Sequence, residues 1–211
     1  MMASEKTISI DDRLAQIVSA VFHPLLIPVY GLLIIFTAPA LYGYLPVQVK
    51  KILFFIILVD NVLIPAMLIL WFRFRNVITT WTMDNRKERI MPLITTSFFY
   101  IFSVYLIYRF HIPFFIKLFI ISSAFLAVAV TVINFWYKIS IHATGAGALT
   151  TLVLILSLRM HVQLAGLMIL VILTSGLVMS SRLWLGAHTP GEVWSGFLLG
   201  ITGSCLCLCF F

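Results

Sequence analysis

Charged side chains are scarce in this sequence. Lys, Arg, Asp and Glu make up 10% of its 211 residues, against about a quarter in a typical soluble domain. Hydrophobic residues make up 62%, and the mean hydropathy is +1.12. This composition excludes a soluble protein and indicates an integral membrane protein. The apolar residues run continuously and do not alternate as in the strands of a membrane barrel, so we expect helices.

Acidic residues are the scarcer charge type, with 7 Asp and Glu against 14 Lys and Arg. The net charge of +7 would suit a nucleic-acid binder, but the sequence has no soluble domain that could carry such a surface. Linkers, low-complexity stretches and internal repeats are also absent. We therefore expect one all-α transmembrane domain over residues 1–211, with no nucleic acid among its partners.

Cysteine is limited to Cys205, Cys207 and Cys209 in the last apolar run. This spacing does not fit a zinc site, so we interpret the three as small hydrophobic side chains. The N-terminus lacks the basic stretch of a cleavable signal peptide, because Glu5 and Asp11 precede the first apolar run. We interpret that run as the first membrane span.

Seven apolar runs are long enough to cross a bilayer, which takes about 20 residues in a helix. The predicted spans are residues 14–38, 52–72, 93–108, 114–137, 143–158, 162–179 and 190–211. The predicted fold is therefore a polytopic helical bundle of six to seven spans. Pro24 and Pro28 should kink or cap the first span, because proline lacks a backbone N–H. Asp60 and Asn61 in the second span should hydrogen-bond to another helix.

Three polar islands interrupt the apolar sequence. The first island is residues 84–92, the second 138–147 and the third 181–192. They follow the second, fourth and sixth spans, so all three are expected on the same side of the membrane as the N-terminus. Ionisable residues at membrane depth are costly and are typically functional. We therefore interpret the three islands as parts of one site.

The third island has the form of a helix start. Thr189 is predicted as the N-cap, Pro190 as the first helical residue and Glu192 as the capping-box partner. His188 lies just before the cap, where Glu192 could hold one ring nitrogen and leave the other free as a nucleophile. A purely structural cap would also explain Glu192, and a carboxylate has two oxygens that can serve both roles.

The other two islands carry residues that suit an anion. Ser140 and His142 precede a Gly-rich helix start, whose N–H groups attract anions, although either residue could simply cap the helix. Lys138 could attract an anionic head group or be an ordinary interfacial lysine. The first island has three basic residues, which the positive-inside rule or phospholipid contact would also explain. These are Arg86, Lys87 and Arg89.

The third island resembles a motif of the type 2 phosphatidic acid phosphatase superfamily, a group of membrane lipid phosphatases. That motif is Ser-Arg-x5-His-x3-Asp. Here Ser181 and Arg182 are followed at the same spacing by His188 and then by Glu192, so that Glu replaces the usual Asp. The side chain is one methylene longer but is able to play the same part.

The two other motifs of that family are matched in part and in the same order. Pro-Ser-Gly-His is matched at Ser140 and His142, with isoleucine in place of Pro and Gly. Lys-x6-Arg-Pro is degenerate, because Thr82 stands where Lys is expected and Pro does not directly follow Arg89. The resemblance covers about residues 84–211.

The resemblance implies metal-independent hydrolysis of a lipid phosphomonoester or diphosphate through a phosphohistidine. His188 would attack phosphorus, Glu192 would orient it and His142 would act as the general acid. The phosphate-binding residues implied are Arg182, Arg89, Arg86, Lys87, Ser140, Lys138 and Ser181. No metal or other cofactor is expected, and the partners are the lipid substrate and the membrane.

Three alternatives use the same residues. A lipid phosphotransferase would pass the phosphoryl group to another alcohol instead of water. An intramembrane metalloenzyme would take His142, His188 and Glu192 as ligands, although the arginines have no role in it. A non-catalytic lipid-binding or transport protein would keep a degenerate site, for which the weak first motif is the argument.

The charges leave the orientation in the membrane open. Nine Lys and Arg lie on the island side and five on the other, which by the positive-inside rule places the islands in the cytoplasm. Five of the nine are assigned to the site, however, and without them the comparison is four against five. We expect an integral protein of the cell membrane, with the side of the site left open.

Overall fold

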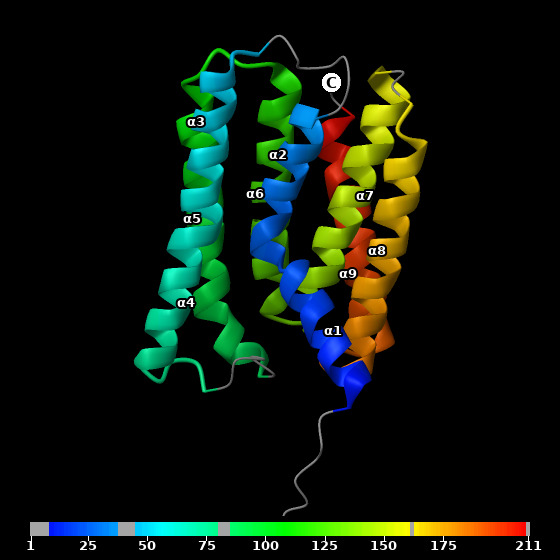
Figure 1. The fold of residues 1–211 in the computed structure, drawn as a ribbon. Coiled ribbons are helices and arrows are strands. Elements are labelled where there is room, and N and C mark those ends of the chain that lie inside the picture. The colour runs from blue at the N-terminus through cyan, green and yellow to red at the C-terminus, as the bar shows by residue number, and fades with distance from the viewer. Residues whose placement is uncertain (1–8, 38–44, 80–84, 161–162, 210–211) are drawn as a thin grey trace, which may run out of the picture.

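The computed structural model of the chain describes residues 9–37, 45–79, 85–160 and 163–209. Within these ranges the structure is helical and contains no strand. Seven of the described helical segments are long and apolar enough to cross a membrane (Figure 1). The predicted all-α transmembrane bundle is therefore confirmed.

The helical elements agree with the predicted spans to within a few residues at their ends. In chain order they are α1 (Ile10–Val21), η1 (Pro24–Leu26), α2 (Ile27–Thr37), α3 (Val47–Leu58), η2 (Val59–Leu63), α4 (Ile64–Phe74), η3 (Arg86–Arg89), α5 (Ile90–Tyr108), α6 (Phe114–Asn134), α7 (Ile141–Met160), α8 (Ala165–Trp184) and α9 (Pro190–Leu208). The predicted boundaries at Ala38, Val162 and Phe211 lie outside the described residues.

The first crossing is broken between α1 and α2, where the chain forms the short 3₁₀ helix η1. His23 caps η1 by accepting a hydrogen bond from the Leu25 N–H at 3.3 Å, and Pro24 is its first residue. Pro28 lies in the first turn of α2. The prolines thus interrupt the span as predicted, because neither can donate to a preceding carbonyl. Before the break, α1 packs against α8.

The second crossing contains a π-helical turn, η2, between α3 and α4. Asp60 and Asn61 lie in this turn and are buried, with 6% and 0% of their surface exposed. The Ser103 hydroxyl of α5 is 2.8 Å from Oδ1 of Asn61 and 3.2 Å from Oδ2 of Asp60. The predicted hydrogen bond to another helix is confirmed, and one hydroxyl serves both side chains.

Helices α7 and α9 pack side by side and begin at the same end of the bundle (Figure 1). Glycines permit the close approach. A Cβ at Gly147 would collide with a backbone carbonyl of α9, and a Cβ at Gly200 with a backbone carbonyl of α7. The Ser140 N–H also donates to the carbonyl oxygen of Glu192 at 3.1 Å. The second and third islands are therefore neighbours.

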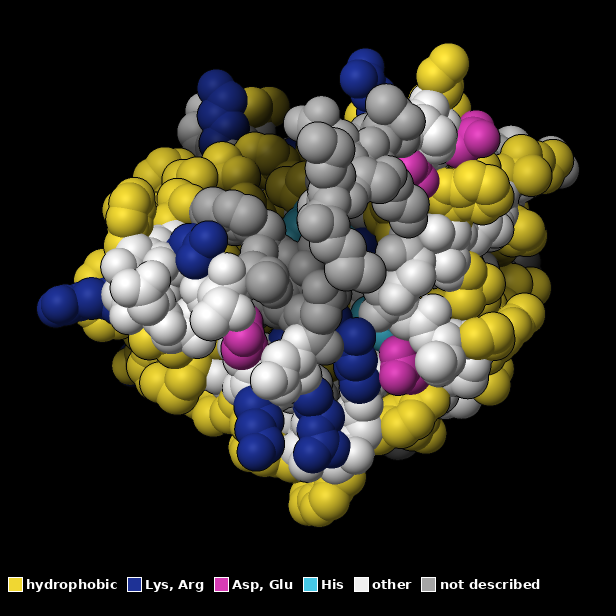
Figure 2. All heavy atoms as spheres, turned by 90° about the horizontal axis from the view of Figure 1, so that it is seen from below, with side chains coloured by type: hydrophobic (Ala, Val, Ile, Leu, Met, Phe, Trp, Pro, Cys, Tyr) yellow, Lys and Arg dark blue, Asp and Glu magenta, His cyan; other side chains and the backbone are white. Residues whose placement is uncertain are grey.

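The three islands lie at one end of the bundle, which is the lower end in Figure 1. Helices α5, α7 and α9 begin at this end, and α6 and α8 finish there. Seen from this end, basic and acidic side chains lie across the face, and hydrophobic side chains follow much of its outline (Figure 2). The shared side predicted from the order of the spans is confirmed for the described residues. Asp84, the first residue of the first island, lies outside them.

Replacing Ser103 with alanine should destabilise the protein. The change leaves the oxygen atoms of Asp60 and Asn61 without their hydroxyl donor in a buried position, which costs about 1–3 kcal/mol of unfolding free energy. Ser123→Ala is the control, because the Ser123 hydroxyl donates to the Phe119 carbonyl within its own helix. Thermal unfolding in detergent should give a lower Tm for Ser103→Ala than for the control. Equal Tm values would contradict the structural role of Ser103.

Candidate functional site

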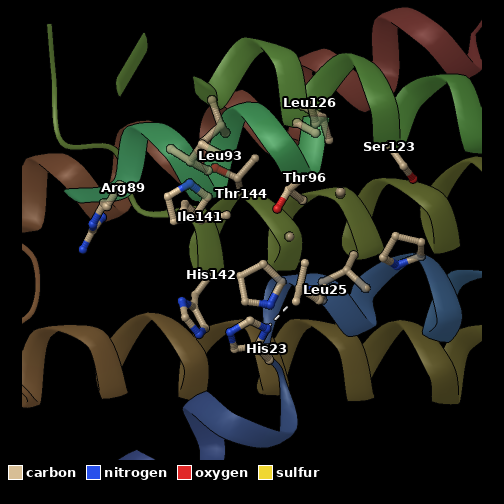
Figure 3. A pocket seen from close by; sticks show the side chains of 18 of the residues that line it. His23, Leu25, Arg89, Leu93, Thr96, Ser123, Leu126, Ile141, His142 and Thr144 are labelled. Carbon is tan, nitrogen blue, oxygen red and sulfur yellow. Dashed lines mark hydrogen bonds between the residues drawn. The ribbon is translucent and has the colours of Figure 1, made fainter. Parts of the chain in front are cut away.

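A cavity of about 500 Å³ lies among the helices, and residues of α1, α2, α5, α6, α7 and α8 line it. Four residues predicted for the site share its lining: Arg89, His142, Arg182 and His188. Figure 3 shows Arg89 and His142 towards one end of this pocket and Ser123 towards the other. Each of the three islands therefore contributes to one cavity.

His188 precedes α9, and Glu192 holds its ring. Nδ1 of His188 lies 2.7 Å from Oε2 of Glu192. A carboxylate accepts hydrogen bonds, so Nδ1 carries the proton and Nε2 keeps its lone pair. The same carboxylate accepts the Thr189 N–H at 3.3 Å, and the Thr189 hydroxyl accepts the Glu192 N–H at 3.4 Å. In the structure Glu192 thus both caps α9 and orients His188.

Burial lowers the pKa of His188 from its ordinary value of 6.5 to about 4. Loss of water around the ring is the main cause, and the positive charges of Arg89 and Arg182 act in the same direction. The hydrogen bond and negative charge of Glu192 raise the pKa but do not cancel the effect of burial. The His188 ring is therefore neutral at pH 7, as a nucleophile requires.

Two guanidinium groups belong to the wall of the cavity. Arg89 is the last residue of η3 and is 5% exposed, and Arg182 lies in the last turn of α8 and is 9% exposed. Nη1 of Arg182 donates to the Ser19 hydroxyl at 3.4 Å. The planar N–H fork of arginine matches the oxygen atoms of phosphate or carboxylate. The wall therefore favours an anionic ligand.

The third island begins inside a helix, which corrects the predicted end of the sixth span at residue 179. Ser181 and Arg182 belong to the last turn of α8, which continues to Trp184. Gly186, with a φ of 60°, follows the end of the helix as terminating glycines commonly do. The Ser181 hydroxyl donates to the Leu177 carbonyl of its own helix at 2.7 Å. The Ser181 hydroxyl is therefore bonded to the backbone of its own helix, and Ser181 does not line the cavity.

Five residues predicted to bind phosphate do not line the cavity: Arg86, Lys87, Lys138, Ser140 and Ser181. The Lys138 ammonium donates to the Ala187 carbonyl at 3.0 Å, which ties the second island to the turn before His188. Lys138 thus supports the position of His188 through the backbone.

Ser140 acts as a helix cap in this structure. The residue is fully buried, and its hydroxyl oxygen accepts the Ala143 N–H at 3.4 Å at the start of α7. Its carbonyl oxygen accepts the Thr144 hydroxyl at 3.0 Å. Of the second motif, His142 is therefore the residue that reaches the cavity.

The first island forms the 3₁₀ helix η3, which runs directly into α5. Asn85 caps it by accepting the Lys87 N–H at 3.0 Å. Of the three basic residues in η3, Arg89 lines the cavity, whereas Lys87 is exposed and Arg86 is partly exposed. The short helix therefore turns one arginine towards the site. Thr82, at the position of the family's lysine, lies outside the described residues.

Ser19 and His23 of the first crossing also line the cavity, although neither was predicted for the site. The Ser19 carbonyl oxygen is 3.2 Å from Nε2 of His142, and the Ser19 hydroxyl accepts from Arg182. The His23 ring meets the His142 ring edge-on, with their centroids 5.6 Å apart (Figure 3). A histidine followed by proline inside an apolar run is the sequence signal that could have indicated this role.

Comparisons with protein-family models, curated proteins and solved structures found no match for this chain. Within the described residues, no three His, Cys, Asp or Glu side chains gather where they could hold a metal ion. What the site can do follows from its own groups, which are two guanidinium groups, three imidazole rings and the carboxylate that orients one of them. These groups suit an anion and a transfer reaction at a histidine.

The His188 ring should stay neutral down to about pH 4. A lowered pKa means that the ring gains its proton only when the pH falls through that lower value. NMR titration of the histidine ring carbons, assigned with a His188→Ala variant, measures the midpoint. In Glu192→Gln the carboxylate charge that raises this pKa is lost, so the midpoint should move to a still lower pH. A midpoint near 6.5 in the parent protein would contradict the burial of this ring.

Proposed function

We propose that the protein hydrolyses a lipid phosphomonoester or diphosphate through a phosphohistidine and without a metal ion, in the manner of the type 2 phosphatidic acid phosphatases. One observation carries the proposal. Arg89, His142, Arg182 and His188 come from three separate islands and line a single cavity. This set supplies a nucleophile, a proton donor and two cationic groups for phosphoryl oxygens.

In the first step, Nε2 of His188 attacks phosphorus, and the bond from phosphorus to the leaving oxygen breaks. Glu192 keeps the proton on Nδ1 and stabilises the positive charge that forms on the ring. Arg89 and Arg182 bind the phosphoryl oxygens, which is the dominant electrostatic contribution in such reactions. His142 takes up a second proton as the phosphate anion binds beside it, and gives this proton to the leaving oxygen.

In the second step, water attacks phosphorus, and the bond between phosphorus and Nε2 of His188 breaks. His142, which is neutral after the first step, takes a proton from the water. The Ser19 carbonyl holds a proton on Nε2 of His142, so Nδ1 is the nitrogen that gives and takes the transferred proton. Inorganic phosphate leaves, and His188 returns to its neutral form.

The remainder of the cavity suits a hydrocarbon chain. Its lining includes apolar side chains from α5 and α6, among them Leu93, Leu126 and Val130. A phosphate group bound by the arginines would leave an attached chain between α5, α6 and α7. A lipid phosphate therefore matches both the polar and the apolar parts of the lining, and a membrane location such as the cell membrane supplies such substrates.

His188→Ala should abolish phosphate release, because the variant lacks the nucleophile. The assay uses purified protein in detergent with polyprenyl, glycerolipid and sphingolipid phosphates, in the presence of EDTA. The parent protein should also form an acid-labile phosphoprotein that the variant does not form. His111→Ala is the control, because His111 is exposed in the turn between α5 and α6, at the other end of the bundle (Figure 1). Substantial activity in His188→Ala, or loss of activity with EDTA, would contradict the mechanism.

Arg89→Ala should lower kcat/KM by about 10²–10³-fold, the usual effect of removing one stabilising donor from a transition state. Arg86→Ala is a matched control from the same short helix, because its side chain is outside the cavity lining. It should change kcat/KM by less than about threefold, as expected for a surface charge. Similar losses in the two variants would show that the first island acts through its overall charge.

A further inference from the structure

The first crossing contributes a ring nitrogen to the cavity. Nδ1 of His23 accepts the Leu25 N–H at 3.3 Å and so caps η1. A backbone N–H donates, so Nδ1 carries no proton and the neutral ring has its proton on Nε2. Within the described part of the chain, Nε2 of His23 makes no hydrogen bond. The cap therefore fixes the tautomer and leaves one N–H donor available.

This donor lies among the groups that would bind phosphate. His23 lines the same cavity as His142, Arg182 and His188. Its ring packs on His142 with an interplanar angle of 82° (Figure 3). One turn earlier, Ser19 is hydrogen-bonded to both His142 and Arg182. The hydrogen bond from the Leu25 N–H and the contact with the His142 ring thus fix the position of the His23 ring.

We propose that His23 is a further substrate-binding residue, whose Nε2–H donates a hydrogen bond to a non-bridging oxygen of the bound phosphoryl group. This inference rests on the phosphatase function proposed above. A neutral donor stabilises the oxygen without adding a further buried charge beside Arg182.

The tautomer separates this role from that of a proton donor. If Nε2 of His23 gave up its proton while Nδ1 accepts the Leu25 N–H, the ring would become an anion. Proton transfer is therefore assigned to His142, and His23 is assigned the binding of a phosphoryl oxygen. A cap alone would not need the second nitrogen, since asparagine is among the preferred N-cap residues.

Two substitutions separate the cap from the donor. In His23→Asn the amide oxygen replaces Nδ1 as the cap, and the Nε2 donor is lost. In His23→Gln the amide N–H lies near the position of Nε2, and the cap is weakened. We expect His23→Asn to lower kcat/KM by about 10²-fold and His23→Gln by less than about tenfold. His111→Asn and His111→Gln are the matched controls and should leave kcat/KM unchanged.

Binding of orthovanadate or inorganic phosphate, measured from the shift of Tm with ligand concentration, provides a readout independent of turnover. His23→Asn should weaken binding more than His23→Gln does. Parent-like turnover and binding in His23→Asn, or equal losses in the two variants, would overturn the inference. If the parent protein binds the anion without hydrolysing any lipid phosphate, the proposed function fails and the binding data alone decide on His23. A parent protein that shows neither activity nor binding overturns both proposals.

Discussion

The site depends on the close approach of α7 and α9. Gly147 and Gly200 leave no room for side chains at the contact, so the two backbones lie against each other. The helices run in the same direction, and a hydrogen bond from the Ser140 N–H to the third island joins their starts. His142 in the first turn of one helix and His188 just before the other therefore face the same cavity. Separation of the two helices would separate the two histidines.

Much of the fold could be predicted because burial in a membrane requires long apolar runs, and such runs are visible in any sequence. Their order was sufficient to place the three islands at one end. The contact between His188 and Glu192 could also be predicted, because residues four apart on a helical turn are neighbours. Thr189 and Pro190 marked the start of that helix directly.

The remaining parts of the site depend on contacts between distant segments, which no local pattern specifies. His23 reaches His142 only because α1 and η1 pack onto the bundle. Lys138 and Ser140 have residue types that suit phosphate, yet they bind the Ala187 carbonyl and the start of α7. Helix ends leave backbone groups without partners within the helix, and satisfying these groups competes with binding a ligand.

An odd number of crossings places the two ends of the described chain on opposite faces of the bundle (Figure 1). The start of α1 lies at the same end as His188, whereas the last turn of α9 lies at the other end. A reporter enzyme that is active in one compartment alone, fused before α1 or after α9, would show in living cells which side of the membrane the cavity of Arg89 and His188 faces. The orientation that the charge count leaves open can thus be measured from the two ends of the bundle.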